Sequence, residues 1–426
     1  MTVFKKKTEL AKGVFWPSYL IGIAVIVLGI ANQKLFGSIL DAGLNWVSDN
    51  FGWWLVLFAL ILVLLVFGLA FSKAGDVVIG GAGAKPEYTM WQWFSMSLKG
   101  GIGTGILFWA MGEPIFHMAA PPAAAGAQPF TREAGLFAIS QTMLHWTIAQ
   151  YAMYSLCAVG VALMAYNRRR TISVSSIFEP YLSSSVYGVV KTVVPMVSLF
   201  CIVGALACSM AVGLMQINSG LNFFFGLPID GVTVFAIAAI MVTVYVVSCL
   251  TGIKKGMRVL SSFCTIVFIG LMVYVLCLGP TRFIVDAGTE SLGVFFNRFF
   301  EHSVILPTMA ENETWSKSWI IMFMASFFVY APIIGLFLAR LGKGRTVREF
   351  IFMNIGAPTL FCIVWIAIWG GTTVWLQYTG IMDVWQSVNE KGLEVTIFTI
   401  LSTLPFAKIL AAFFIIAVFF FLLDNG

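Results

Sequence analysis

The chain has 426 residues, of which 60% are hydrophobic, 15% aromatic and only 10% charged. Soluble domains carry about 25% charged residues, so this chain lacks the polar surface that a soluble protein presents to water on all sides. The net charge of +6 comes from basic residues that cluster between apolar runs, as orientation signals do, and it indicates no nucleic-acid partner. The composition therefore predicts an all-α polytopic membrane protein and excludes a soluble enzyme.

Ten segments are long and apolar enough to span a bilayer, since a spanning helix needs about 20 mainly apolar residues. They lie near residues 15–35, 53–72, 90–112, 134–165, 192–222, 230–250, 258–279, 316–340, 350–376 and 405–424. The first apolar run has full membrane length and no small-residue cleavage site, so we expect a retained helix rather than a signal peptide. Between the seventh and eighth spans, residues 281–315 predict an amphipathic helix at the outer interface.

The Lys and Arg residues gather in alternate loops, and this pattern predicts the orientation of the chain. The side that includes the N-terminus carries the runs Asn167–Arg170 and Arg340–Glu349, whereas acidic residues prevail on the opposite side. We expect a cytoplasmic N-terminus and a bacterial inner membrane. The basic run Arg340–Arg348 is interpreted as a topology signal alone. The seven cysteines lie inside apolar segments without C-x-x-C spacing, which indicates small core residues rather than disulfides or metal ligands.

The third span contains the stretch "GGIGTG" at Gly100–Gly105. A pair of glycines in a membrane helix often only permits close packing. Four glycines in six residues also weaken the helix, and a broken helix at membrane depth is tolerated where it lines a binding site. We therefore expect an unwound binding segment here.

The fourth span contains the stretch "HWTIAQYAMY" at His145–Tyr154. On a continuous helix Tyr151 and Tyr154 adjoin, and Trp146 lies near Tyr154. Such an aromatic stripe can pack against neighbouring helices. It can equally hold a quaternary ammonium ion, which is attracted to the faces of aromatic rings. The residues alone leave both interpretations open.

The chain has three histidines. His145 adjoins the aromatic stripe and is either a proton relay or, more commonly, a structural histidine with satisfied hydrogen bonds. His117 and His302 fall on the outer side without clustered partners in the sequence. We expect no metal site and no cofactor.

Several segments together resemble the betaine/choline/carnitine transporter family. They include "GGIGTGILFWAMGEPIFH", "QTMLHWTIAQYAMY", "GIKKGMRVLSS", "APIIGLFLARLGKGRTVREF" and "WGGTTV", in this order along the chain. The resemblance implies a LeuT-like fold, in which two leading helices precede two inverted five-helix repeats with the substrate near the midplane. It also implies a homotrimer.

On that scheme residues 1–426 form a single transmembrane transporter domain. Residues 1–85 hold the tail and the two leading helices, 86–280 the first repeat, and 316–426 an incomplete second repeat. The family has twelve helices, so we expect a chain truncated after the tenth.

Transferred position by position, the resemblance implies an aromatic substrate cage at Trp146, Tyr151 and Tyr154. In the eighth span Phe327 stands where the family has its cage tryptophan, and Tyr330 replaces another tryptophan. Phe and Tyr attract cations less strongly than Trp. The substrate therefore stays open among betaine, carnitine, choline and related sulfonium or amino-sulfonate compounds.

The Gly-rich segment carries two further expectations. Exposed backbone N–H groups of Gly101, Gly103 and Gly105 are expected to bind the substrate carboxylate, as half-helix ends bind anions. In sodium-coupled family members this segment and a Thr-Ser pair in the tenth helix bind sodium, and here Lys99 and Asp424 take positions in the two halves of that site. Since a lysine inside the membrane needs a partner, we expect Lys99 to replace the ion, with Asp424 as its counter-charge. The alternative is a Lys99 side chain that reaches the cytoplasmic interface.

These features predict a secondary transporter or antiporter of small quaternary ammonium compounds, independent of sodium and suited to osmoprotection. A receptor or osmosensor that binds such ligands without moving them is the alternative. A channel is disfavoured because no ring of charges is visible. No pairing of nucleophile and base suggests an enzyme.

Overall fold

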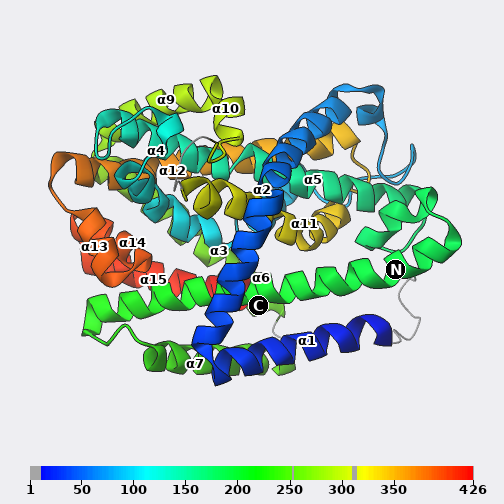
Figure 1. Ribbon diagram of the computed structural model, residues 1–426, viewed down its shortest axis with the longest axis horizontal. Coiled ribbons are helices and arrows are strands. Elements are labelled where there is room, and N and C mark those ends of the chain that lie inside the picture. Colours follow the sequence, from blue (N-terminus) through cyan, green and yellow to red (C-terminus); the bar gives the residue numbers. More distant parts are fainter. Residues whose placement is uncertain (1–10, 252–253, 309–313, 426) are drawn as a thin grey trace. The chain divides into compact units, whose positions relative to one another are not determined.

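The computed structural model describes residues 11–251, 254–308 and 314–425. Within these ranges the side chains of residues 99–104, 248–251, 254–262 and 424–425 are not described. The described chain is almost wholly helical (Figure 1), and its described residues include one isolated β-bridge, between Val78 and Thr346. The chain divides into two compact units, each assembled from three separate segments.

The first unit comprises Met1–Phe94, Ala152–Ala205 and Met324–Asn354. It contains the first two long helices and the parts of later helices that fall in these segments. Its elements are α1 (Lys12–Ala31), α2 (Gln33–Phe71), η1 (Lys73–Asp76), η3 (Leu163–Asn167), η4 (Val174–Tyr181), and parts of α5 (Ile148–Ala162), α6 (Ser184–Phe225), α11 (Met322–Leu341) and α12 (Val347–Thr379).

The basic loop after α11 is bound to the loop after α2 within this unit. The Gly344 N–H donates to the Ile79 carbonyl (2.8 Å), and the Ile79 N–H donates to the Arg345 carbonyl (2.9 Å). Arg348 forms an ion pair with Asp76 at 2.8 Å. The predicted topology signal at Arg340–Arg348 therefore has a structural role as well, because it joins two loops far apart in the sequence.

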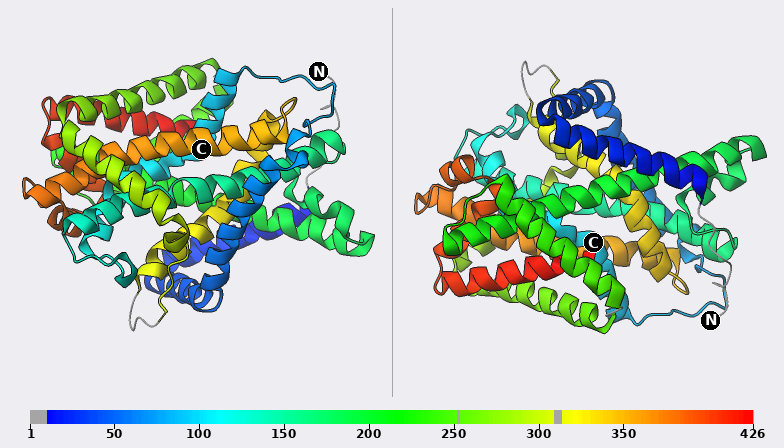
Figure 2. Two further views of the ribbon diagram at one scale, coloured as in Figure 1. Left: turned by 90° about the horizontal axis from the view of Figure 1, so that it is seen from above. Right: turned by 90° about the horizontal axis from the view of Figure 1, so that it is seen from below.

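The second unit comprises Ser95–Tyr151, Leu206–Phe323 and Ile355–Gly426. Within it α4 packs along α9, and α8 runs beside α15 (Figure 2). It contains the remaining parts of α5, α6, α11 and α12. Its other elements are most of α3 (Met90–Ala119), η2 (Ala123–Ala125), α4 (Arg132–His145), α7 (Gly231–Thr251), α8 (Lys254–Leu278), α9 (Thr281–Asn297), α10 (Phe299–Ser303), η5 (Lys317–Ile321), α13 (Val384–Lys391), η6 (Leu393–Val395), α14 (Thr396–Ser402) and α15 (Ala407–Asn425).

Helices cover every one of the ten predicted spans. By length and apolar composition six of the described helices can cross a membrane, and a seventh span is formed if the bent pair Phe263–Leu278 and Thr281–Asn297 counts as one. The second member of that pair is α9, which together with α10 occupies the predicted amphipathic segment. The chain bends by 106° between the two members. The prediction of an all-α polytopic membrane protein is confirmed.

The position of the helix break differs from the expectation. The helix α3 runs continuously from Met90 to Ala119, so the predicted unwinding at Gly100–Gly105 is wrong. The break lies instead in the fourth span, where α4 ends at His145 and α5 begins at Ile148. Helix propensity is a weak prior that tertiary packing overrides, and at Gly105 the absent side chain serves packing: an added Cβ would lie 2.7 Å from the Trp146 ring.

Candidate functional site

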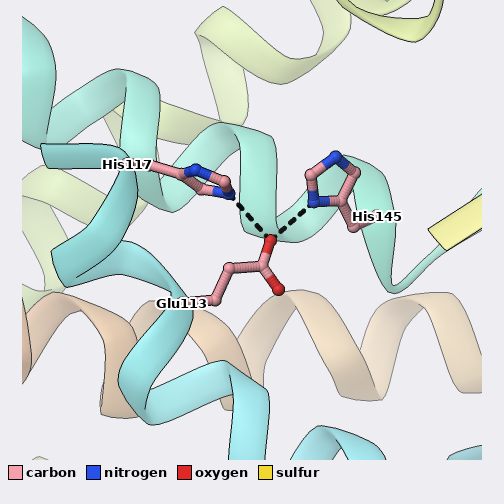
Figure 3. A group of neighbouring side chains, drawn as sticks. All are labelled: Glu113, His117 and His145. Atoms are coloured by element: carbon pink, nitrogen blue, oxygen red, sulfur yellow. Dashed lines mark hydrogen bonds and ion pairs between the residues drawn. The ribbon is translucent and has the colours of Figure 1, made fainter. Parts of the chain in front are cut away.

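A carboxylate and two imidazoles meet inside the second unit. Glu113 and His117 lie one helical turn apart on α3, where i,i+4 side chains share a face. His145 is the last residue of α4, and the chain leaves the helix immediately after it, at Trp146. Figure 3 shows the Glu113 carboxylate between the two rings. All three residues are 0% exposed.

The Glu113 carboxylate accepts three hydrogen bonds. Its Oε1 lies 2.6 Å from His145 Nδ1 and 3.0 Å from His117 Nε2. Its Oε2 accepts from the indole N–H of Trp146 at 2.8 Å. Because hydrogen bonds to a charged acceptor are about twice as strong as neutral ones, this arrangement stabilises an ionised carboxylate away from water.

Each imidazole has a second polar partner on its far side. The indole N–H of Trp315 points at His117 Nδ1 (3.2 Å), and Gln141 Nε2 lies 3.0 Å from His145 Nε2. An indole nitrogen can only donate. His117 Nδ1 must therefore accept, which places the His117 proton on Nε2, where it is donated to Glu113.

Aromatic rings enclose this polar cluster. The ring centroids of His117 and Trp319 are 4.5 Å apart, and those of His145 and Phe323 are 4.8 Å apart. Phe323 also packs at 5.2 Å against Trp146. A charge buried among apolar groups is costly unless it is hydrogen-bonded and compensated. The hydrogen bonds to Glu113 therefore offset the cost of burying its charge.

One possible metal-ligand atom from each of the three residues lies within 4.8 Å of the others. Carboxylates and imidazoles suit a metal ion as well as a network of protons. A histidine that binds a metal usually donates its other ring N–H to an acceptor. Trp315 instead offers a donor to His117 Nδ1, and that hydrogen bond would be lost if His117 Nε2 coordinated a metal as a neutral imidazole. The observed hydrogen bonds therefore fit protons rather than a metal.

The expectation that His117 has no clustered partners is wrong. Glu113 and His145 are 32 positions apart in the sequence, so no local spacing signals their contact. The pairing arises because α3 and α4 bring one turn of each helix together. The nearest local sign is the i,i+4 spacing of Glu113 and His117, which places both on one face.

His302, on α10, lies apart from this cluster behind Phe137, whose ring is 5.3 Å from the His302 ring and 6.2 Å from the His117 ring. Burial lowers the pKa of His302 to about 4. The third histidine is therefore neutral at physiological pH.

The predicted cage residues are distributed over the two units. In the second unit Trp146 lies against Gly105, and the Tyr151 hydroxyl is 3.2 Å from Cys362 Sγ. In the first unit the rings of Tyr154 and Phe327 meet edge to face at 6.5 Å. These four aromatic residues are 2 to 6% exposed. The hydroxyl of Tyr330, also in the first unit, donates to the Ala205 carbonyl at 2.9 Å.

The remaining predicted site residues are Lys99, Asp424 and three glycines of α3. The side chains of Lys99 and Asp424 lie outside the described part of the chain, although both residues belong to helices, α3 and α15. Because α3 is helical through Gly101, Gly103 and Gly105, its N–H groups there are engaged within the helix. The expected carboxylate contact with free N–H groups therefore loses its basis.

Comparison with known proteins supplies the family. The pattern of the BCCT family, the betaine/carnitine/choline family of transporters, matches residues 13–424. A probable glycine betaine transporter of Desulfitobacterium hafniense is 27% identical over 92% of this chain and 77% of its own length. An ectoine/hydroxyectoine transporter of Virgibacillus pantothenticus is 28% identical over 99% of this chain and 83% of its own. A high-affinity choline transport protein of Escherichia coli is 29% identical over 78% of this chain and 49% of its own.

These matches confirm the predicted family, and since its members are transporters they also confirm that the chain is not an enzyme. A multi-pass helical chain whose family pattern extends from residue 13 to residue 424 belongs to the betaine/carnitine/choline family of transporters.

Proposed function

We propose that the protein is a secondary transporter of small quaternary ammonium compounds and related compact osmolytes, which it moves by alternating access. The family supports this class of activity, and the named relatives include transporters for glycine betaine, ectoine and choline. The observation that carries the proposal is the state of Trp146. Its ring is 6% exposed, lies against Gly105 and has its N–H fixed by Glu113, so its orientation is set before any substrate binds.

In this proposal Trp146, Tyr151, Tyr154, Phe327 and Tyr330 bind the trimethylammonium group. A quaternary ammonium ion cannot donate a hydrogen bond, and aromatic faces attract it by about 0.5 to 2 kcal/mol per favourable ring. With Phe327 and Tyr330 in place of tryptophans, the site is suited to a substrate that depends less on cation–π attraction than the family's usual ligands do. A carnitine, sulfonium or amino-sulfonate substrate belongs to the same chemical range.

The wider architecture is part of the proposal. We place two leading helices within residues 1–85, a first five-helix repeat in 86–280, an outer amphipathic segment in 281–315 and part of a second, inverted repeat in 316–426, as in LeuT-like transporters. The N-terminus faces the cytoplasm of a bacterial cell, because the basic loops alternate with acidic ones. From the family resemblance we also propose that the protein forms a homotrimer.

In this proposal Lys99 determines whether transport is coupled to sodium. A lysine in the Gly-rich helix supplies a fixed positive charge where sodium-coupled relatives hold an ion, and Asp424 supplies the opposite charge. Transport is then independent of sodium.

Uptake into proteoliposomes tests the activity. The protein should accumulate labelled glycine betaine, choline or ectoine, and accumulation should be equal with and without a sodium gradient. Trp146→Ala should abolish uptake, whereas Trp46→Ala, which changes an exposed tryptophan on α2 (60% exposed), should not.

Two outcomes would contradict parts of the proposal. Binding of these ligands without accumulation would indicate a receptor or osmosensor. Uptake that requires sodium and is unchanged in Lys99→Ala would refute the role of Lys99 and leave the rest in place.

A further inference from the structure

We propose that Glu113, His117 and His145 form a buried site that binds one exchangeable proton, and that this proton competes with a cationic substrate at Trp146. The first part stands on the hydrogen-bond geometry alone. The second part rests on the proposed function, because it takes Trp146 as a substrate-binding residue.

The proton count follows from the partners of each ring. His117 accepts from Trp315 at Nδ1 and donates from Nε2 to Glu113, so it is neutral. His145 donates from Nδ1 to Glu113, and its Nε2 faces the amide nitrogen of Gln141, which donates. His145 is then neutral as well. With an ionised Glu113, the cluster carries one net negative charge that is shielded from water.

Gln141 provides the place for one further proton. Its Oε1 is buried without a hydrogen-bond partner in the described part of the chain, although its Nε2 is bonded to His145. Rotation of the amide exchanges the two atoms, which are nearly equal in size. Oε1 would then accept from a protonated His145 Nε2. The cluster thus has two fully hydrogen-bonded states. One state holds one more proton, taken up from the solvent, and its net charge is one unit more positive.

His117 cannot take this role without loss of a bond. Its Nδ1 faces the N–H of Trp315, so a proton on Nδ1 would oppose a donor to a donor. Protonation of the cluster is therefore assigned to His145, and His117 is a positioning residue that holds the Glu113 carboxylate.

The ionisable groups that act on Glu113 are His145 and His117, and those that act on His117 are Glu113 and His145. The helix α12 approaches α3 through Thr373, whose hydroxyl donates to the Met111 carbonyl. Among the described residues of the second unit, further ionisable groups on elements near the cluster include Arg132 and Glu133 on α4, Arg282, Asp286 and Glu290 on α9, Glu301 and His302 on α10, Lys317 on η5, Cys362 and Tyr378 on α12, Glu390 and Lys391 on α13 with Asp383 before it, and Glu394 on η6.

Trp146 connects the cluster to the substrate. It donates to Glu113 Oε2 (2.8 Å), so the negative charge lies directly behind a ring that attracts cations. Loss of that charge on protonation weakens the binding of a cation such as choline. By reciprocity, choline binding expels the proton. Glycine betaine has no net charge and is much less affected.

Choline and glycine betaine binding to the full-length protein in lipid nanodiscs tests the competition. Calorimetry in buffers of different ionisation enthalpy reports the protons released. Below the titration midpoint of the cluster, we expect about one proton released per choline bound. The choline Kd should rise about tenfold for each unit by which the pH falls. Glu113→Gln should abolish both effects. A choline Kd that does not change with pH in the wild type would overturn the competition.

Infrared difference spectroscopy tests the proton site without any substrate, so its result does not depend on the proposed function. A pH step should produce imidazolium bands in the wild type, and these bands should disappear in His145→Gln. In Gln141→Leu the pH midpoint at which the bands appear should shift, because leucine cannot accept a hydrogen bond from His145. The matched control His302→Gln, at a buried histidine outside the cluster, should leave these bands unchanged. Bands that persist in His145→Gln would refute the site.

A zinc titration distinguishes a proton-binding site from a metal-binding site. Zinc added to the purified protein should bind no more tightly to the wild type than to His117→Gln or His145→Gln. Tight zinc binding that both substitutions abolish would overturn the proton site in favour of a metal site. Absence of choline and betaine binding together with normal imidazolium bands would refute the proposed function and retain the proton site.

Discussion

Gly105→Ala tests the packing that orients Trp146. A Cβ at residue 105 would lie 2.7 Å from Cη2 and 2.9 Å from Cζ3 of the indole. Carbon atoms pack at about 3.5 to 4.0 Å, so the ring must retreat by about 0.8 Å or more. Its N–H bond to Glu113, now 2.8 Å, would then exceed the usual limit of about 3.2 Å.

These contacts set the size of the expected loss of stability. Overpacking costs about 1 to 3 kcal/mol, and a hydrogen bond to a charged group contributes about 1.5 to 3 kcal/mol. We expect a loss of about 2 to 5 kcal/mol in the free energy of unfolding, since the two effects partly overlap. Because Trp146 is a proposed substrate-binding residue, displacement of its ring should also raise the KM for uptake about tenfold, which corresponds to about 1.4 kcal/mol.

Thermal stability in detergent and uptake kinetics in proteoliposomes measure these effects. The matched control is Gly270→Ala on α8, where an added Cβ meets no atom of the described residues within 4 Å. That variant should be as stable as the wild type or more so, because alanine favours a helix by about 1 kcal/mol over glycine. A Gly105→Ala protein with the melting temperature and KM of the wild type would refute the packing argument.

Three further predictions concern single side chains. Gly344→Ala should lower the melting temperature, because Gly344 has φ +79 and an added Cβ would lie 2.2 Å from the Lys85 carbonyl carbon. The control is Gly356→Ala, where an added Cβ has no atom of the described chain within 4 Å. Equal melting temperatures of the two variants would contradict the strain at Gly344. Trp315→Phe should leave His117 Nδ1 without its donor and destabilise the protein by about 1 to 3 kcal/mol, measured by thermal unfolding; a change below about 0.5 kcal/mol, typical of surface substitutions, would contradict the tautomer assignment.

The third concerns His302, whose pKa burial lowers from 6.5 to about 4. The unfolded chain then binds more protons than the native one between these values, so stability contributed by neutral His302 is present above pH 6.5 and is lost as the pH falls toward 4. His302→Gln should reduce this loss in thermal unfolding at acidic pH, and an unchanged pH profile would contradict it.

The break in the fourth span shows where local patterns fail. Glycine content weakens a helix, which favoured a break at Gly100–Gly105, yet the backbone of α3 is helical there. The break occurs at Trp146, a residue with no strong tendency to end a helix. Burial of its ring against Gly105 and its bond to Glu113 stabilise the local departure from helical geometry, and neither contact is visible in a window of sequence.

The loop contacts of the first unit show the same limit. The basic residues after α11 were interpreted as a topology signal, since clustered charge is sufficient to indicate orientation. Hydrogen bonds from Lys343 to Glu87 and from Arg345 to the Tyr88 carbonyl join residues more than 250 positions apart. Charge composition is a local property, whereas the partner of each charge depends on how distant segments pack.

The sequence by itself determined the class of protein, the approximate positions of the helices and the family, because hydropathy over about 20 residues and ordered motifs are properties of the linear chain. It also identified Trp146 and His145 as notable residues. Only the tertiary structure decided that Glu113, His117 and His145 form one buried cluster, and that Gly105 makes room for an indole. Those relations depend on the approach of α3 and α4, and side chains from different helices meet only when the chain has folded.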